Sequence, residues 1–237
     1  MKILFVYGYG GNPDSTFCRL IREALASPTL HGTHYDVCCY EYPQQDCAKA
    51  KECLEEIIGC EGIDLVIGSS LGAFITLALE TDKPKIAINP CMRPSAVLPL
   101  LKPRQDHPED VAPSPEMIAT YLPFEEAVNN GAGHASNQVT GLFGHKDELL
   151  GAKYFKSFRA AYGNAKPMPG GHHGNKEAIP TIVSAIEEMR KVYMHTHRKL
   201  NITKTITAVE GDKDECECMP HIRLQGMALM GKTPSED

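Results

Sequence analysis

The sequence has no excess of basic residues. Its 24 lysines and arginines stand against 30 aspartates and glutamates, which gives a formal net charge of −6. Binding to nucleic acid or to an anionic membrane depends on a basic surface that displaces counterions. We therefore expect neither of these partners.

Long apolar runs and export signals are also missing. The longest uncharged apolar run, residues 65–79, has 15 residues, whereas about 20 are needed to span a bilayer. The apolar segment ILFVY (3–7) leads directly into a glycine-rich turn without a cleavage-like site, so we expect no signal peptide. The nine cysteines are odd in number, and several lie in apolar runs. They are expected to be reduced thiols in a cytoplasmic protein without a membrane span.

Short apolar segments alternate with segments of helical periodicity along most of the chain. Hydrophobic residues make up 42% of the sequence, which is enough for a packed core. The alternation predicts an α/β fold with a mostly parallel sheet, right-handed crossovers and helices on both faces. We expect strands over 2–8, 35–43, 64–69, 85–90, 138–144 and 165–169, and helices over 15–27, 46–58, 71–80, 151–162 and 179–194.

Two segments depart from this alternation. Residues 91–137 hold much of the proline and have short helical patterns only near 94–101 and 115–128. Such an insertion predicts a short cap or lid over a site. From residue 199 the composition becomes polar, so we expect one domain over 1–198 and a partly disordered C-terminal appendage over 199–237.

One motif carries a specific chemical prediction. The motif GSSLG (68–72) directly follows an apolar strand and directly precedes a helix. This is the context of a nucleophile elbow, in which a serine lies on a tight, strained turn that exposes its hydroxyl. The alternative is a plain tight turn. The strand and the helix on either side favour the elbow, with Ser70 as the nucleophile.

A serine needs a base and an orienting acid before it can act as a nucleophile. In this architecture the chain order is Ser, then Asp or Glu, then His, each at the carboxyl end of a strand. Asp147 follows the strand expected over 138–144, and His173 follows the short strand near 165–169. Asp147 could instead be only a helix N-cap, and the histidines could belong to an ordinary surface loop. The glycines before them favour a positioned catalytic loop.

The reaction also needs two N–H donors for the oxyanion that forms during attack. The first is expected at Leu71, the residue after the nucleophile, where the positive end of a helix dipole adds to the effect. The second should come from the loop YGYGGN (7–12) after the first strand, where we expect the backbone N–H of Tyr9.

Several short stretches together resemble the YqiA-like esterases, a family of compact α/β-hydrolases. They are the glycine-aromatic turn after the first strand, GSSLGAF (68–74), NPCMRP (89–94) and GGHH (170–173), within a resemblance that extends over about residues 2–195. The resemblance implies an α/β-hydrolase fold, activity on acyl esters or thioesters, and Ser70, Asp147 and His173 as nucleophile, acid and base. The family pattern GGxH favours His173 over His172. Tyr7 stands where the family usually has histidine, and Gly174 where an aromatic residue is usual.

Two further patterns match cofactor or metal sites only in part. Residues 226–233 match the P-loop pattern, but Pro234 follows at once and excludes the helix that would hold a phosphate. Cys216, Cys218 and His221 lack a fourth ligand and the usual zinc spacing. We expect no cofactor and no metal.

Two functions from different classes follow from these observations. The first is a serine hydrolase that cleaves a carboxylic ester or acyl thioester of a small molecule through an acyl-enzyme on Ser70. The second is a non-catalytic α/β-hydrolase-fold binding module that uses its C-terminal appendage for partners. The three groups in the correct order favour the enzyme.

Overall fold

The structure is a computed structural model that describes residues 1–26, 33–101, 112–131, 133–134, 138–150, 153–172, 176–191 and 193. The chain divides into two units, Met1–Arg198 and Lys199–Asp237. The second unit lies wholly outside the described residues, so the expected appendage stays a prediction.

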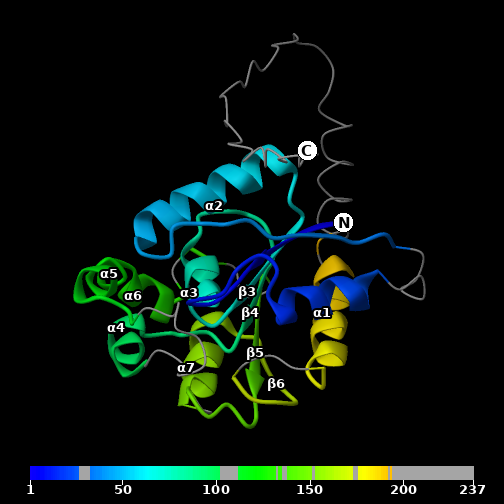
Figure 1. Cartoon of the computed structure of the whole chain (residues 1–237). Coiled ribbons are helices and arrows are strands. Elements are labelled where there is room, and N and C mark those ends of the chain that lie inside the picture. Colours follow the sequence, from blue (N-terminus) through cyan, green and yellow to red (C-terminus); the bar gives the residue numbers. More distant parts are fainter. Residues whose placement is uncertain are drawn as a thin grey trace, which may run out of the picture. The chain divides into compact units, whose positions relative to one another are not determined.

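A single parallel sheet forms the centre of the first unit. Its six strands run in the order β2-β1-β3-β4-β5-β6, and every neighbouring pair is parallel (Figure 1). The strands are β1 (Lys2–Val6), β2 (Asp36–Cys38), β3 (Leu65–Ser69), β4 (Lys85–Ile88), β5 (Val139–Gly144) and β6 (Ala165–Met168). Every residue of β3, β4 and β5 is buried, as a sheet covered on both faces requires. The expected α/β architecture is confirmed.

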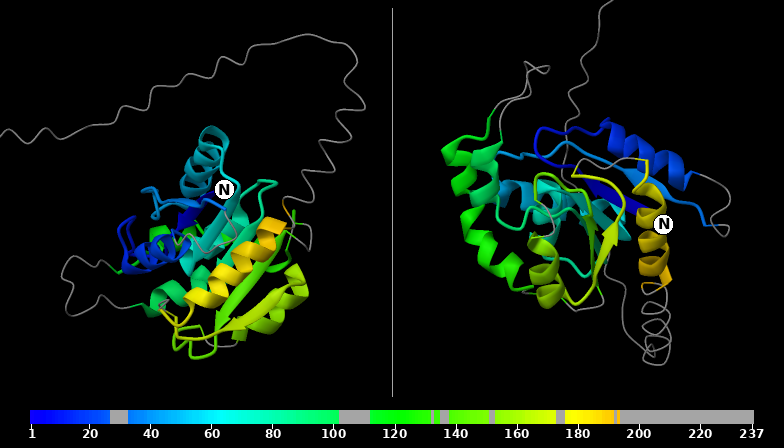
Figure 2. Two further views of the ribbon diagram at one scale, coloured as in Figure 1. Left: turned by 90° about the vertical axis from the view of Figure 1, so that its right-hand side faces the viewer. Right: turned by 90° about the horizontal axis from the view of Figure 1, so that it is seen from below.

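Helices cover both faces of this sheet (Figure 2). One face carries α1 (Thr16–Leu25) and a helix over 179–191, and the other carries α2 (Cys47–Glu61), α3 (Leu71–Ala78) and α7 (Lys153–Tyr162). The step from β1 to β2 runs across the sheet in the opposite direction to the step from β2 to β3. Right-handed crossovers therefore place α1 and α2 on opposite faces.

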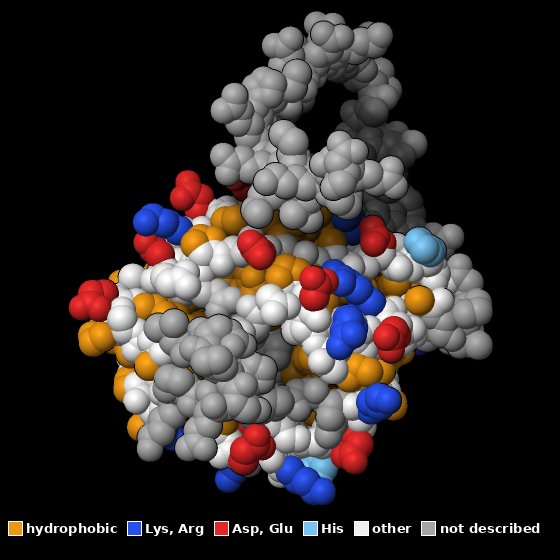
Figure 3. Space-filling view, viewed as in Figure 1, with side chains coloured by type: hydrophobic (Ala, Val, Ile, Leu, Met, Phe, Trp, Pro, Cys, Tyr) orange, Lys and Arg blue, Asp and Glu red, His pale blue; other side chains and the backbone are white. Residues whose placement is uncertain are grey.

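Short helices occupy the segment between β4 and β5 in which a cap was predicted. They are α4 (Pro94–Val97), the 3-10 helix η1 (Leu98–Leu100), α5 (Pro115–Ala119) and α6 (Leu122–Asn129). The carboxylate of Glu125 accepts hydrogen bonds from the backbone N–H and the hydroxyl of Ser95, at 2.7 and 2.9 Å, which joins α6 to α4. Leu100 and Leu122 are 72% and 54% exposed, and Figure 3 shows hydrophobic side chains at the surface beside α5 and α6.

The edge strand β2 is shorter than predicted. The sequence predicted a strand over 35–43, but only Asp36–Cys38 pairs, with Lys2–Leu4 of β1. Beyond Cys38 the chain leaves the sheet, and the buried Tyr42 hydroxyl donates to the carbonyl oxygen of Tyr7 at 2.5 Å. This segment supports the loop that follows β1 instead of extending the sheet.

One lysine is fully buried at the start of β4. The ammonium of Lys85 donates to the carbonyl oxygen of Leu79 at 2.6 Å, and one ring nitrogen of His134 lies 2.7 Å from the carbonyl oxygen of Leu77. Burial lowers the pKa of Lys85 to about 7. The two side chains tie the carboxyl end of α3 to β4 and to the loop before β5.

In the described part of the chain, every helix is too short or too polar to cross a membrane.

Candidate active site

The turn between β3 and α3 holds Ser70 in a strained conformation. Its φ of 55° and ψ of −118° are outside the regions that residues with a side chain normally adopt. Such strain costs on the order of 1–3 kcal/mol and persists only where the surroundings enforce it. Here the backbone N–H of Ser70 donates to the carbonyl oxygen of Ile88 at 2.9 Å, and its carbonyl oxygen accepts from the N–H of Cys91 at 3.1 Å.

The glycines of GSSLG are needed because α3 approaches the sheet very closely. A Cβ atom on Gly68 would lie 2.5 Å from the Cα of Ala73, and one on Gly72 would lie 2.3 Å from the carbonyl oxygen of Val6. Neither distance is possible without a backbone shift. The motif is therefore an elbow in geometry as well as in sequence.

An imidazole links the Ser70 hydroxyl to a carboxylate. Nε2 of His172 lies 2.9 Å from Oγ of Ser70, and Nδ1 of His172 lies 3.1 Å from Oδ2 of Asp147. His172 is 3% exposed and Asp147 is 9% exposed. The three groups come from the loops that follow β3, β5 and β6. The carboxyl ends of these parallel strands lie at the same edge of the sheet, which brings the three side chains together.

Asp147 also organises its own turn. Its Oδ1 accepts the backbone N–H groups of Leu149 and Leu150 at 3.0 and 2.8 Å, while Oδ2 faces His172. Burial by itself raises the pKa of Asp147, but the hydrogen bonds to His172 and to these two N–H groups outweigh it and hold the pKa below its ordinary value. The carboxylate thus both caps the turn and faces the imidazole, so the two roles weighed for it are compatible.

The histidine at this position is not the one named from the sequence. His173, the predicted base, lies outside the described residues together with Gly174 and Asn175. The hydrogen bonds expected of a base belong to the preceding residue, His172. The backbone N–H of His172 donates to the carboxylate of Glu148 at 3.2 Å. This hydrogen bond holds the backbone of His172 to the loop that follows β5. Adjacent residues of an irregular loop point in different directions, and the pattern GGxH could not tell which direction leads to Ser70.

Each predicted oxyanion donor is the sequence neighbour of a residue at the elbow or against it. Leu71 is the first residue of α3. In the loop after β1, Gly8 lies against the nucleophile, since a Cβ on it would be 3.0 Å from Cβ and 3.6 Å from Oγ of Ser70. Tyr9 follows Gly8 directly. The assignment of the backbone N–H groups of Tyr9 and Leu71 as donors stays a prediction.

Sequence reasoning missed a side chain that holds this loop. Gln44 is 8% exposed, and its Oε1 accepts the N–H of Gly10 at 3.1 Å while its Nε2 donates to the carbonyl oxygen of Gly11 at 3.4 Å. Its own carbonyl oxygen accepts the hydroxyl of Tyr121 from the cap segment at 2.6 Å. Gln44 also forms a side-chain hydrogen bond with Tyr7, the residue that differs from the family pattern. Nothing local in the sequence marks this role, because it depends on the approach of two distant loops.

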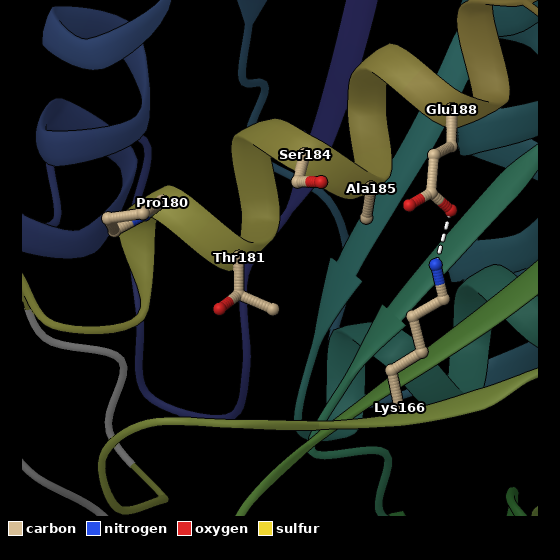
Figure 4. A pocket seen from close by; sticks show the side chains of 6 residues that line it. All are labelled: Lys166, Pro180, Thr181, Ser184, Ala185 and Glu188. Carbon is tan, nitrogen blue, oxygen red and sulfur yellow. Dashed lines mark hydrogen bonds and ion pairs between the residues drawn. The ribbon is translucent and has the colours of Figure 1, made fainter.

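Two surface hollows lie away from these groups. One, of about 280 Å³, lies between β6 and the helix over 179–191. It is lined by Lys166, Pro180, Thr181, Ser184, Ala185 and Glu188 (Figure 4). The other, of about 440 Å³, is lined by residues of α2 and of the turn before β4. Neither lining includes Ser70, Asp147 or His172, so neither hollow belongs to the candidate site. Within the described ranges, no cluster of three or more His, Cys, Asp or Glu side chains could hold a metal ion.

Solved structures with the same fold come from esterases and hydrolases. Est1E from Butyrivibrio proteoclasticus matches with a TM-score of 0.57 and 17% identity, over 82% of this chain and 88% of that chain. Alpha/beta hydrolase domain-containing protein 10 from mouse matches with a TM-score of 0.54 and 16% identity, over 80% and 89%. A monoacylglycerol lipase from Paleococcus ferrophilus matches with a TM-score of 0.54 and 16% identity, over 82% and 94%. The chain therefore has the α/β-hydrolase fold.

No protein-family model matches the sequence, and no curated protein matches it either.

Proposed function

We propose that this protein is a serine hydrolase that cleaves a carboxylic ester or acyl thioester of a small molecule. The observation that carries the proposal is the placement of His172, with Nε2 2.9 Å from Oγ of Ser70 and Nδ1 3.1 Å from Oδ2 of Asp147. Distances in this range allow direct proton transfer from the hydroxyl to the imidazole. The names of the structural neighbours, which are esterases and lipases among others, are consistent with this chemistry.

In the proposed reaction, Oγ of Ser70 bonds to the acyl carbon while its proton passes to Nε2 of His172. The oxyanion that forms accepts hydrogen bonds from the backbone N–H groups of Leu71 and Tyr9. The bond to the leaving oxygen or sulfur then breaks, and His172 returns its proton to that atom. Water attacks the acyl-enzyme by the same route, which releases the acid and restores Ser70. Asp147 holds the imidazole with its proton on Nδ1 and stabilises the imidazolium.

His172 replaces His173 as the base in this proposal. The rest of the predicted set, Ser70 and Asp147, is retained. Membership of the YqiA-like esterases remains part of the proposal, supported by GSSLGAF, NPCMRP and GGHH. The cytoplasmic location expected from the cysteines stays a prediction.

The rival function is a binding module without catalysis. Covalent labelling with a fluorophosphonate probe separates the two, because only an activated serine reacts. We expect the wild-type protein and Ser69→Ala to be labelled, and Ser70→Ala to be unlabelled with a nearly unchanged Tm. A series of p-nitrophenyl esters and acyl thioesters of increasing chain length then identifies the acyl group. An unlabelled wild-type protein would contradict the proposed function.

A further inference from the structure

The first residue of NPCMRP connects the loops around the candidate site. Asn89 directly follows β4 and is 1% exposed. Its Nδ2 donates to the carbonyl oxygens of Gly171 and His172, both at 3.0 Å, and its Oδ1 accepts the N–H of Gly144 at 2.7 Å. One side chain therefore joins the end of β4, the end of β5 and the loop that carries the imidazole.

The backbone of Asn89, like that of the nucleophile, has a positive φ. Its φ is 43°, and within the described residues only Asn89 and Ser70 have a positive φ without being glycine. Asparagine adopts this region more readily than most residues, but the conformation still requires support from its surroundings. Here the N–H of Asn89 donates to the carbonyl oxygen of Leu142 in β5 at 2.8 Å.

The turn at Asn89 is also hydrogen-bonded to the turn that carries Ser70. The residue before Asn89, Ile88, accepts the N–H of Ser70 at 2.9 Å, and Cys91 donates to the carbonyl oxygen of Ser70 at 3.1 Å. The backbone around Asn89 is thus bonded to the turn of Ser70, while its side chain is bonded to the loop of His172.

We propose that Asn89 is a positioning residue that sets the distance between Oγ of Ser70 and Nε2 of His172. The proposal rests on the proposed serine hydrolase function. A displacement of about 1 Å at reacting groups can lower a rate about 100-fold. Loss of the two donated hydrogen bonds should therefore lower kcat by roughly 10- to 100-fold. KM should stay within about twofold, because the amide of Asn89 is buried and hydrogen-bonded to backbone groups of the protein.

Two variants separate the bonds of this side chain. Asn89→Asp keeps an acceptor for the N–H of Gly144 but removes both donors, and Asn89→Gly removes the whole side chain while tolerating the positive φ. The matched control is Asn129→Asp in α6, because Nδ2 of Asn129 also donates to two carbonyl oxygens, those of Met92 and Glu125, at 2.8 and 2.6 Å. The control loses the same kind of bonds without touching the loop of His172.

The experiment measures kcat and KM on a chromogenic ester, with rates normalised to sites titrated by a fluorophosphonate, and Tm for each protein. We expect both Asn89 variants to be labelled at Ser70 but slowly, with kcat lowered and KM retained, and Asn129→Asp to keep kcat within about threefold at a similar loss of Tm. Asn89→Asp is nearly isosteric and carries the test alone if Asn89→Gly does not fold. Wild-type kcat in Asn89→Asp, or an equal loss in Asn129→Asp, would overturn the inference. An unlabelled wild-type protein would instead remove the proposed function.

Discussion

Replacing the carboxylate at position 147 by an amide tests the proposed mechanism most directly. In the structure Oδ1 of Asp147 accepts two backbone N–H groups, and Oδ2 lies 3.1 Å from Nδ1 of His172. In Asp147→Asn the amide oxygen must keep the two N–H groups, so the NH₂ group faces the imidazole. Nδ1 must then accept, and the ring proton moves to Nε2, the nitrogen 2.9 Å from Ser70. That tautomer cannot take the serine proton.

The expected loss is about 10⁴-fold in kcat, the size measured when a triad aspartate is replaced by asparagine in another fold. This corresponds to roughly 5.5 kcal/mol of transition-state stabilisation. The fold should lose much less, about 1.5–3 kcal/mol, because one charge-assisted hydrogen bond is removed while the turn keeps its cap. Turnover of a chromogenic ester per titrated site gives kcat, and thermal unfolding gives the stability.

Glu148→Gln is the matched control for this variant. Glu148 accepts the backbone N–H of His172 at 3.2 Å, and a glutamine oxygen can accept the same hydrogen. We expect its kcat to remain within about tenfold of wild type. If Asp147→Asn kept more than a hundredth of wild-type kcat, or Glu148→Gln fell as far, the role given to Asp147 would be wrong.

Asp147→Asn also gives a test in which the direction of the change in stability with pH is predicted. The pKa of Asp147 is lower in the folded protein than its ordinary value of about 3.9. Its ionised form therefore stabilises the fold above about pH 4, and this contribution is lost as the pH falls through the lower folded value. The difference in Tm between wild type and Asp147→Asn should shrink as the pH falls below about 4. A difference that grew in that range would refute the reasoning.

Three further predictions follow from side chains described above. His172→Ala should lower kcat about a thousandfold or more, and His173→Ala far less. An active His172→Ala beside an inactive His173→Ala would show that His173 is the base. Gln44→Ala removes the acceptor of the Gly10 N–H, so kcat should fall about tenfold in the same ester assay. An unchanged kcat would show that the loop over 7–12 keeps its conformation without Gln44. The contribution of Lys85 to stability should rise with pH above about 7 by up to ~1.4 kcal/mol per unit, because unfolded Lys85 holds its proton more tightly. The difference between wild type and Lys85→Met in urea unfolding from pH 7 to 9 measures this slope, and a difference independent of pH would contradict it.

Most of the architecture could be predicted from periodicity and turn residues. The alternation of short apolar segments with helical segments predicts strands over 64–69, 85–90 and 138–144, and the structure has β3, β4 and β5 there with every residue buried. The error at β2 has a physical cause. Residues 39–43 have strand-like composition, but the chain leaves the sheet after Cys38 and the Tyr42 hydroxyl donates to the carbonyl oxygen of Tyr7 instead.

The site was predictable only where local sequence controls geometry. GSSLG specifies its own turn, since the steric demands at Gly68 and Gly72 are met within a few residues. The direction of the imidazole is set by partners from other loops, at Asn89 and Glu148, which lie 83 and 24 residues away from His172. No periodicity reports such contacts.

The construction of this site has a consequence for refolding. Ser70 and His172 are 102 residues apart in sequence, and the strands β3 to β6 must all be paired before their loops meet. Closing so long a loop costs entropy that local contacts do not repay. Each helix can form early, but we expect the hydrogen bond between Oγ of Ser70 and Nε2 of His172 to form in the last steps of folding. Reactivity of Ser70 toward a covalent probe therefore counts completely folded molecules, whereas helical circular dichroism also counts chains whose sheet is still open.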